Sequence, residues 1–160
     1  MQNAGSHSLA QALLAFLALP GVVAIAVRFA LAAGNRPDGH TGALAGALAG
    51  ALFLLGGLLL GWCVREFYVA GRGTLAPWAP PLQLVVSGPY RYSRNPMYIA
   101  VALILAGWAV FYWSSALLVY AVRTGVGCQL RVLFGEEPRM ARAFGAAWES
   151  YRARTKRWLL

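Results

Sequence analysis

The chain has 160 residues, of which 59% are hydrophobic and 12% are charged, and its formal net charge is +9. A soluble domain carries a charge on about 25% of its residues. The sequence therefore has too few ionic groups to cover a water-exposed globule, and it indicates one domain of an integral membrane protein. Its basic residues flank apolar segments instead of forming a soluble face. This argues against a nucleic-acid partner and favours membrane lipids with anionic headgroups.

Four apolar segments predict an all-α bundle that crosses the bilayer. A hydrocarbon core of about 30 Å requires about 20 helical residues. The expected spans cover residues 9–31, 41–64, 97–113 and 114–134. The third is short, and the aromatic residues near its end would lie at the membrane interface. With the fourth span it should form a tight antiparallel hairpin that turns at Trp113-Ser114-Ser115.

Glycines recur at four-residue steps in the second span. They are Gly42, Gly46, Gly50, Gly57 and Gly61. A stripe of small residues lets helix backbones approach closely in lipid. We expect this stripe to pack against another span of the same chain. A seam between two copies would use the same pattern, so the oligomeric state stays open.

Breaker residues separate the second span from the third. Pro77, Pro80 and Pro81 predict an irregular loop on the membrane surface. Gly71 and Gly73 open this loop. They could let the backbone approach a ligand or simply end the second span, and the residues alone favour the second interpretation.

Arginine and lysine gather on one side of the expected spans. They lie between the second and third spans and after the fourth, whereas the connection between the first two carries only Arg36 and Asp38. An excess of basic residues marks the cytoplasmic side. We therefore expect a multi-pass protein whose termini, and any site beside these arginines, are cytoplasmic.

The segment after the fourth span has the pattern of an amphipathic helix. Over residues 138–153, apolar and aromatic side chains share one helical face and most arginines fall elsewhere. Such a helix lies on the membrane interface rather than crossing it. By default it is an anchor, and it could also form a lid over a site.

The hairpin brings together two polar patches that are far apart in the sequence. Arg94 and Asn95 precede the third span, and Glu136 and Glu137 follow the fourth. Antiparallel packing would place both patches at the cytoplasmic edge. Pro96 suits the first turn of a helix, where its missing N–H costs nothing. The free N–H groups of that turn favour an anion such as a carboxylate.

Two arginines share one face of the fourth span. An arginine near the bilayer centre costs at least about 2.5 kcal/mol, so Arg123 should face the bundle interior or a wet cavity. It is either a structural residue bonded to backbone carbonyls or a contact for a polar group of a substrate. Arg131 is nearer the cytoplasmic end, where it could extend to the interface or pair with one of the glutamates.

Glu136 and Glu137 are two of only five acidic residues in the chain. Adjacent glutamates at a helix end would ordinarily be a solvated terminus, but these two should lie beside a cluster of arginines. A carboxylate accepts hydrogen bonds from an ammonium group or from ribose hydroxyls. The pair therefore fits a nucleoside cofactor that carries an amino acid.

These residues form a recognisable set of motifs between residues 65 and 158. The set comprises Gly88-Pro89-Tyr90-Arg91, Arg94-Asn95-Pro96-Met97-Tyr98, Arg131, Glu136-Glu137, Phe144-Gly145 and Tyr151. It resembles the superfamily of isoprenylcysteine carboxyl methyltransferases and phospholipid methyltransferases. The resemblance implies a helical membrane enzyme that binds S-adenosylmethionine at the cytoplasmic edge, while the methyl acceptor enters from the bilayer.

The resemblance also implies roles for individual residues. The cofactor pocket would include Pro89, Tyr90, Asn95, Pro96, Met97, Tyr98, Glu136 and Glu137, with Gly71 and Gly73 as weaker additions. The catalytic candidates, which would orient an acidic acceptor or the carboxylate of the cofactor, are Arg94, Arg131 and Arg123. Isoprenylcysteine enzymes usually have histidine where Asn95 stands. Asn-Pro-Met-Tyr and Glu-Glu-Pro look more like the phospholipid N-methyltransferases.

We therefore expect methyl transfer from S-adenosylmethionine to a lipophilic acceptor. That acceptor could be an isoprenylcysteine-like carboxylate, a phospholipid amine or a small lipophilic molecule. In-line attack on an activated methyl group depends on positioning and desolvation, and it needs no metal or covalent nucleophile. Two other classes stay open, an NADPH-dependent steroid-type membrane reductase and a non-enzymatic membrane scaffold.

Overall fold

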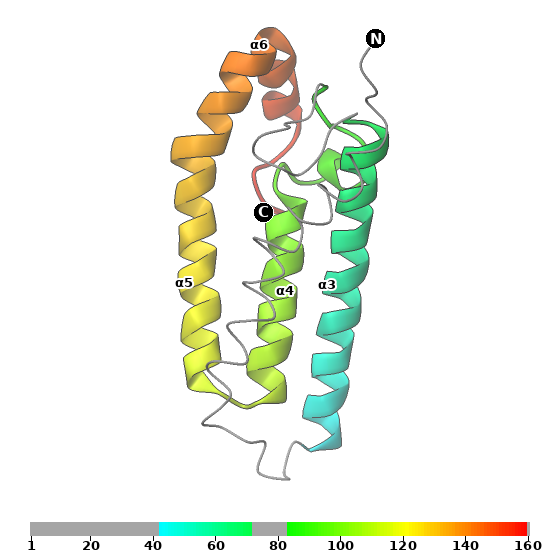
Figure 1. Cartoon of the computed structure of the whole chain (residues 1–160), viewed down its shortest axis with the longest axis vertical. Helices are drawn as coiled ribbons and strands as arrows, with labels where there is room; N and C mark the ends of the chain where they lie inside the picture. Colours follow the sequence, from blue (N-terminus) through cyan, green and yellow to red (C-terminus); the bar gives the residue numbers. More distant parts are fainter. Residues whose placement is uncertain (1–41, 72–82, 160) are drawn as a thin grey trace, which may run out of the picture.

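The computed structural model of the chain describes residues 42–71 and 83–159. All regular secondary structure in these residues is helical, as the sequence predicts. It comprises α3 (Ala43–Val69), the 3-10 turn η2 (Gly88–Arg91), α4 (Pro96–Phe111), α5 (Ser115–Arg131), the π-helical turn η3 (Val132–Glu136) and α6 (Glu137–Arg154) (Figure 1). The first expected span, residues 9–31, lies outside the described residues.

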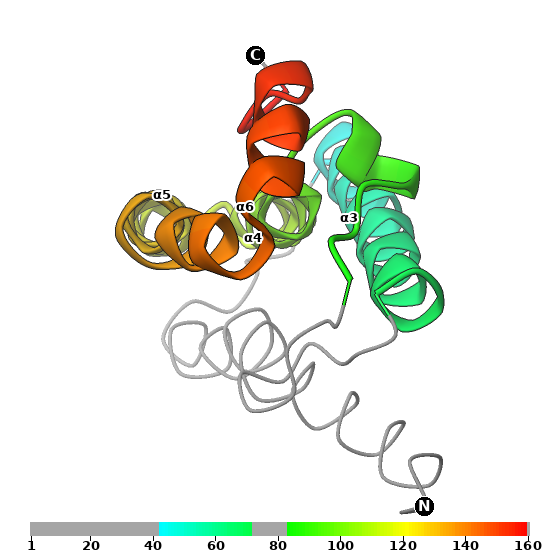
Figure 2. The ribbon, with the colours of Figure 1, turned by 90° about the horizontal axis from the view of Figure 1, so that it is seen from above.

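Three long helices run side by side, with α4 between α3 and α5 (Figure 1). The chain passes along α4 and returns along α5, so these two helices form the predicted antiparallel hairpin. α6 leaves the end of α5 and crosses over the end of the bundle at which α4 begins (Figure 2). The polar residues of the hairpin are therefore gathered at that one end.

Within residues 42–71 and 83–159, two helical stretches are long and apolar enough to cross a membrane. α3 has 27 residues and a mean hydropathy of 2.3 in its most apolar window, and the continuous stretch Ser115–Arg154 reaches 1.3. α4 has 16 residues, which gives it a length of about 24 Å. It is therefore shorter than the hydrocarbon core, as expected from the sequence. The four-span topology as a whole stays a prediction.

The surfaces of α3 and α5 are apolar. Leu54 and Leu58 on α3 are 62% and 64% exposed, and Val122 on α5 is 60% exposed. Large contiguous apolar surfaces are rare on soluble proteins and mark sites of interaction with a membrane or a partner. The outward faces of these two helices are thus suited to lipid.

Close packing of α3 on α4 depends on two glycines. A Cβ atom at Gly56 would lie 2.8 Å from Ile104 Cγ1 and 2.9 Å from the carbonyl oxygen of Ala100, and one at Gly107 would lie 2.8 Å from the Phe53 ring. The glycine stripe predicted to pack (Gly42, Gly46, Gly50, Gly57 and Gly61) meets no described residue within 4 Å. The close contact with α4 is thus made by other glycines, and the packing of the stripe against another span of the chain stays a prediction.

Replacement of Gly56 by alanine should destabilise the protein. Alanine normally favours a helix over glycine by about 1 kcal/mol, but overpacking a tight contact costs about 1–3 kcal/mol. We expect Gly56→Ala to lower the thermal unfolding midpoint of the solubilised protein. The adjacent Gly57→Ala, whose Cβ enters open space, should leave it equal or raise it. Equal midpoints for the two variants would contradict the close approach of α3 and α4.

The hairpin turns at Trp113-Ser114-Ser115, as predicted. Trp113 has a φ of 46°, in the left-handed region, and its side chain is 85% exposed. Ser114 is the N-cap of α5, and its Oγ accepts a hydrogen bond from the Leu117 N–H at 3.4 Å. At the same end the Trp108 ring packs on Phe53, with the ring centroids 4.5 Å apart. The expected cluster of aromatic residues therefore lies at the end of the bundle opposite the polar residues.

Candidate active site

The two ends of the hairpin meet as the sequence predicts. Arg94 Nη1 donates a hydrogen bond to Glu137 Oε1 at 2.8 Å across 43 residues of sequence. Arg94 precedes α4 and Glu137 begins α6. The Asn-Pro corner and the paired acids thus line one region, below α6.

A π-helical turn lies at the two glutamates, between α5 and α6. The Glu137 N–H donates to the carbonyl oxygen of Val132, five residues back, which widens the helix at η3. Such turns appear mostly as single insertions in α-helices and are frequent at functional sites. Adjacent helical residues project in different directions, about 100° apart in an α-helix, and Glu136 and Glu137 have entirely different partners.

Glu136 forms a centre with Tyr98 and Arg131. The Tyr98 hydroxyl donates to Glu136 Oε1 at 2.5 Å, and Arg131 Nε donates to the same oxygen at 2.9 Å. The Glu136 side chain is 31% exposed. Among the described residues, its other oxygen, Oε2, accepts no hydrogen bond. As far as the described part of the chain goes, Glu136 therefore has one carboxylate oxygen open to a ligand.

Glu137, in contrast, is bonded at both carboxylate oxygens by two arginines. Arg157 Nε and Nη2 donate to its two oxygens, each at 2.8 Å, in addition to the bond from Arg94. Its side chain is 12% exposed and that of Arg94 is 9% exposed. The Trp148 ring covers Arg94, whose Cζ lies 5.7 Å from the ring centroid. Glu137 thus holds α6, the start of α4 and the C-terminal tail together, and the cofactor contact predicted for it stays a prediction.

The pH dependence of folding should report the Glu137 cluster. Burial alone would raise the pKa of Glu137, but the hydrogen bonds from Arg157 and the charge of Arg94 hold this pKa below its usual range. A lowered folded pKa gives stability that is present above the unfolded value, about 4.3, and is lost as the pH falls through the folded value. We expect the thermal unfolding midpoint to fall between pH 6 and pH 3. The midpoint should fall less steeply with decreasing pH in Glu137→Gln than in the wild type. If the midpoints of the two proteins had the same pH dependence, the Glu137 carboxylate would not stabilise the fold in this way.

The C-terminal tail, residues 155–159, is part of the same structure. The carbonyl oxygen of Lys156 accepts a hydrogen bond from the Arg94 N–H at 2.9 Å. The carbonyl oxygen of Arg157 accepts bonds from Ser93 Oγ and Asn95 Nδ2, each at 3.1 Å. The side-chain amide of Asn95 therefore positions the tail, whereas the sequence suggested direct contact with a cofactor.

Tyr90 and Met97 belong to a small core rather than to an open surface. Tyr90 is 6% exposed and packs with Cys63 and Val85, and Met97 lies against this cluster. The Tyr90 carbonyl oxygen accepts a hydrogen bond from the Tyr151 hydroxyl at 2.7 Å. The Tyr90 side chain thus fastens the loop before α4 to α3. Of the two tyrosines predicted to wall the cofactor pocket, Tyr98 is the one at the Glu136 centre.

The remaining predicted residues are dispersed. Pro89 is buried in η2, and Pro96 is buried in the first turn of α4. Gly71 is buried just after α3, where its N–H donates to the Glu66 carbonyl at 3.3 Å, and Gly73 lies outside the described residues. Arg123 is exposed with respect to the described part of the chain. It lies about 12 Å along α5 from Arg131, so it does not join the centre.

Sequence reasoning missed a second buried carboxylate, Glu66 on α3. Ser87 Oγ donates to Glu66 Oε2 at 2.5 Å, and Trp62 Nε1 and Arg65 Nη1 donate to Oε1 at 3.3 and 3.1 Å. Gly88, with a φ of +56°, approaches so closely that a Cβ there would lie 2.6 Å from Glu66 Cγ. Glu66 thus clamps the loop before α4. The available signal was an acidic residue at the end of an apolar helix. Because a buried carboxylate needs hydrogen-bond or charge partners, such a residue predicts a polar contact there.

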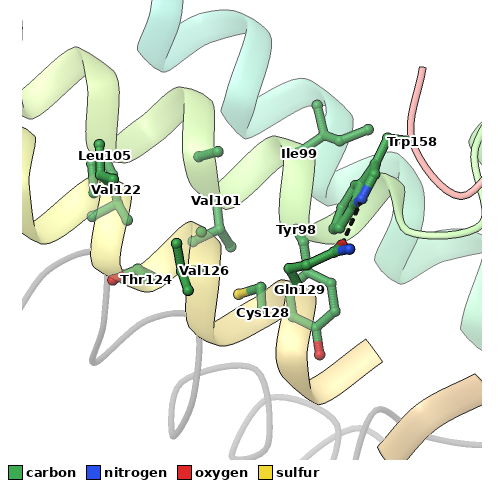
Figure 3. A pocket seen from close by; sticks show the side chains of 13 residues that line it. Tyr98, Ile99, Val101, Leu105, Val122, Thr124, Val126, Cys128, Gln129 and Trp158 are labelled. Carbon is green, nitrogen blue, oxygen red and sulfur yellow. Dashed lines mark hydrogen bonds between the residues drawn. The ribbon is translucent and has the colours of Figure 1, made fainter. Parts of the chain in front are cut away.

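An apolar groove of about 550 Å³ lies between α4 and α5. Tyr98 lines its end at the Glu136 centre, together with Gln129 and Trp158 (Figure 3). Trp158 Nε1 donates to Gln129 Oε1 at 2.8 Å. The groove and the Glu136 centre therefore share the side chain of Tyr98.

The sequence model for phospholipid methyltransferases matches residues 44–147, more than half of the chain. The chain belongs to the phospholipid methyltransferase family. This confirms the resemblance seen in the sequence motifs and supports a methyltransferase of the membrane. The matched region contains Tyr98, Arg131, Glu136 and Glu137, and it ends before the C-terminal tail. No curated protein and no solved structure matches the chain.

Proposed function

We propose that the chain transfers a methyl group from S-adenosylmethionine to a phospholipid amine. The observation that carries this proposal is the Glu136 centre. It presents a carboxylate oxygen free of described partners beside Tyr98, at the end of an apolar groove. Membership of the phospholipid methyltransferase family supports the reaction class and favours a lipid acceptor.

The residues of this centre fit S-adenosylmethionine. The free oxygen of Glu136 suits the ammonium group of the cofactor or its ribose hydroxyls, both of which are hydrogen-bond donors. Arg131 uses Nε on Glu136, and an arginine has further N–H groups in its planar fork for a carboxylate. When bound, the cofactor supplies a methyl group activated on a sulfonium sulfur. The protein's own residues bind and orient the reactants, and positioning of this kind can supply a large part of a rate enhancement.

We propose different roles for the two acids. Glu136 would contact the cofactor, while Glu137, with Arg94 and Arg157, would keep α6 and the tail over the site. Arg94 is then a positioning residue, because its guanidinium is held by Glu137 and covered by Trp148. Arg131 is the arginine among the three catalytic candidates that lies at the proposed cofactor position.

Methyl transfer from labelled cofactor to defined lipids tests this function. Purified full-length protein in nanodiscs would be incubated with methyl-labelled S-adenosylmethionine and either phosphatidylethanolamine or phosphatidylcholine. We expect label in phosphatidylethanolamine only, because the phosphatidylcholine nitrogen already carries three methyl groups and has no lone pair. A third incubation would contain a prenylated cysteine peptide. Label in that peptide, with none in phosphatidylethanolamine, would contradict the proposed acceptor. Saturable binding of NADPH and no binding of S-adenosylmethionine would favour the reductase alternative and contradict the proposal.

A further inference from the structure

The groove between α4 and α5 is somewhat shorter than one membrane leaflet is thick. It extends from Tyr98 to Leu105 on α4 and from Ala121 to Gln129 on α5, which corresponds to about 10–12 Å of helix. One leaflet contributes about half of a 30 Å hydrocarbon core. Its volume of about 550 Å³ lies in the range of pockets that hold one small ligand, about 300–1,000 Å³.

Polar groups are concentrated at one end of this groove. Away from that end the lining is small or aliphatic, as at Val101, Leu105 and Val126, apart from the hydroxyl of Thr124 (Figure 3). At the Glu136 end it carries the Tyr98 hydroxyl and the Gln129 amide. This distribution matches an amphipathic ligand whose hydrocarbon chain lies between the helices and whose headgroup lies beside Glu136.

Trp158 covers this polar end from the side of the C-terminal tail. Its ring lies between Ile99 and Gln129, and its N–H donates to Gln129 Oε1 at 2.8 Å (Figure 3). The tail itself is held by the hydrogen bonds of Ser93 and Asn95 to Arg157 and by the pairing of Arg157 with Glu137. The indole is thus fixed in place, although it lies outside the region matched by the family.

We propose that this groove takes one hydrocarbon chain of the methyl acceptor, and that Trp158 closes its end so that the headgroup stops beside Tyr98 and Glu136. This inference rests on the proposed function. Trp158 would then be a specificity-determining residue, because it fixes the depth at which the acceptor sits. The groove is continuous with the candidate site through Tyr98. This side chain lines the groove, and its hydroxyl donates a hydrogen bond to the Glu136 carboxylate of the site.

Two glycines on α5 provide a matched pair of variants. Gly125 lines the groove and Gly127 does not, and a Cβ atom at either position meets no described residue within 4 Å. A leucine at residue 125 should fill the groove, whereas one at residue 127 should point away from it. Both replace glycine on the same helix, so their effects on helix propensity should cancel in the comparison.

The first readout is methyl transfer to two acceptors with the same headgroup. One is long-chain phosphatidylethanolamine and the other is glycerophosphoethanolamine, which has no hydrocarbon chain. We expect Gly125→Leu to lower kcat/KM for the long-chain acceptor by about ten-fold or more, in line with steric discrimination in apolar pockets. It should leave the chainless acceptor and the affinity for S-adenosylmethionine unchanged. Gly127→Leu should change neither the activity on either acceptor nor the affinity for S-adenosylmethionine. Equal losses of activity on the long-chain acceptor in the two variants would overturn the proposal.

The second readout needs no catalysis and tests Trp158 directly. Phosphatidylethanolamine with brominated chains should quench the fluorescence of Trp158, measured as the difference between the wild type and Trp158→Phe. We expect this quenching to be lost in Gly125→Leu and kept in Gly127→Leu. Quenching with this pattern, but without methyl transfer to any lipid, would support lipid binding in the groove and refute the proposed function.

Trp158→Ala should lower the preference for the long-chain over the chainless acceptor, again by about ten-fold. An unchanged preference would overturn the role of Trp158.

The groove could instead hold another segment of this chain or a second copy. In either case Gly125→Leu should lower the thermal unfolding midpoint or change the oligomeric state relative to Gly127→Leu, and the brominated lipid should not quench Trp158. That result would also overturn the proposal.

Discussion

Glu137→Ala should destabilise the protein by about 3–5 kcal/mol, the usual cost of breaking a buried ion pair from one side. The substitution leaves the buried guanidinium of Arg94 without its carboxylate and releases Arg157. Like charges would then face each other below α6. We expect the loss in the free energy of unfolding measured by denaturant titration of the solubilised protein, and trypsin should cleave the tail more rapidly.

Glu149→Ala is the control for this experiment. Glu149 pairs with Arg152 at 3.8 Å, and the two side chains are 60% and 51% exposed. An exposed pair of this kind contributes at most about 1 kcal/mol, so the variant should be nearly as stable as the wild type. If Glu137→Ala were no less stable than Glu149→Ala, Glu137 would not hold the tail.

Glu136→Gln should have the opposite profile, with lost activity and retained stability. The amide keeps the shape of the carboxylate and still accepts hydrogen bonds from Tyr98 and Arg131, but it has no charge for a cationic ligand. A hydrogen bond to a charged group contributes about 1.5–3 kcal/mol, so kcat/KM for methyl transfer should fall by about 10–100-fold. The unfolding midpoint should change little, because the side chain is partly exposed.

Glu149→Gln is again the matched control, since it removes the same charge from an exposed position of α6. It should retain the activity of the wild type. Equal activity in Glu136→Gln and Glu149→Gln would show that the Glu136 centre is not the cofactor site, whatever the function of the chain.

The hairpin could be predicted because two apolar helices joined by only three residues must run antiparallel to pack against each other. That arrangement brings the segment of Arg94 and the segment of Glu137, 43 residues apart, to the same end of the bundle. The partners of each glutamate could not be predicted, because they depend on the π-helical turn at η3, and no pattern in the sequence predicted that turn. A regular helix would have rotated Glu136 and Glu137 differently toward α4.

Long-range packing explains the other differences. Tyr90 sits in a motif that suggests a ligand wall, but Cys63 and Phe67 on α3 provide a buried place for its ring. The tail had only a weak pattern, and its position depends on backbone carbonyls of Lys156 and Arg157. Backbone acceptors are the same in every residue, so the sequence carries no sign of which ones will be used.

Titration of S-adenosylmethionine into the purified protein in nanodiscs, followed by calorimetry, tests the central claim most directly. The claim is that the cofactor binds to Glu136, and not to Glu137, whose two oxygens are bonded by arginines. We expect one cofactor to bind per chain, with an affinity about 10–100-fold lower in Glu136→Gln and unchanged in Glu149→Gln. No saturable binding to the wild type, or the same affinity in Glu136→Gln, would contradict it.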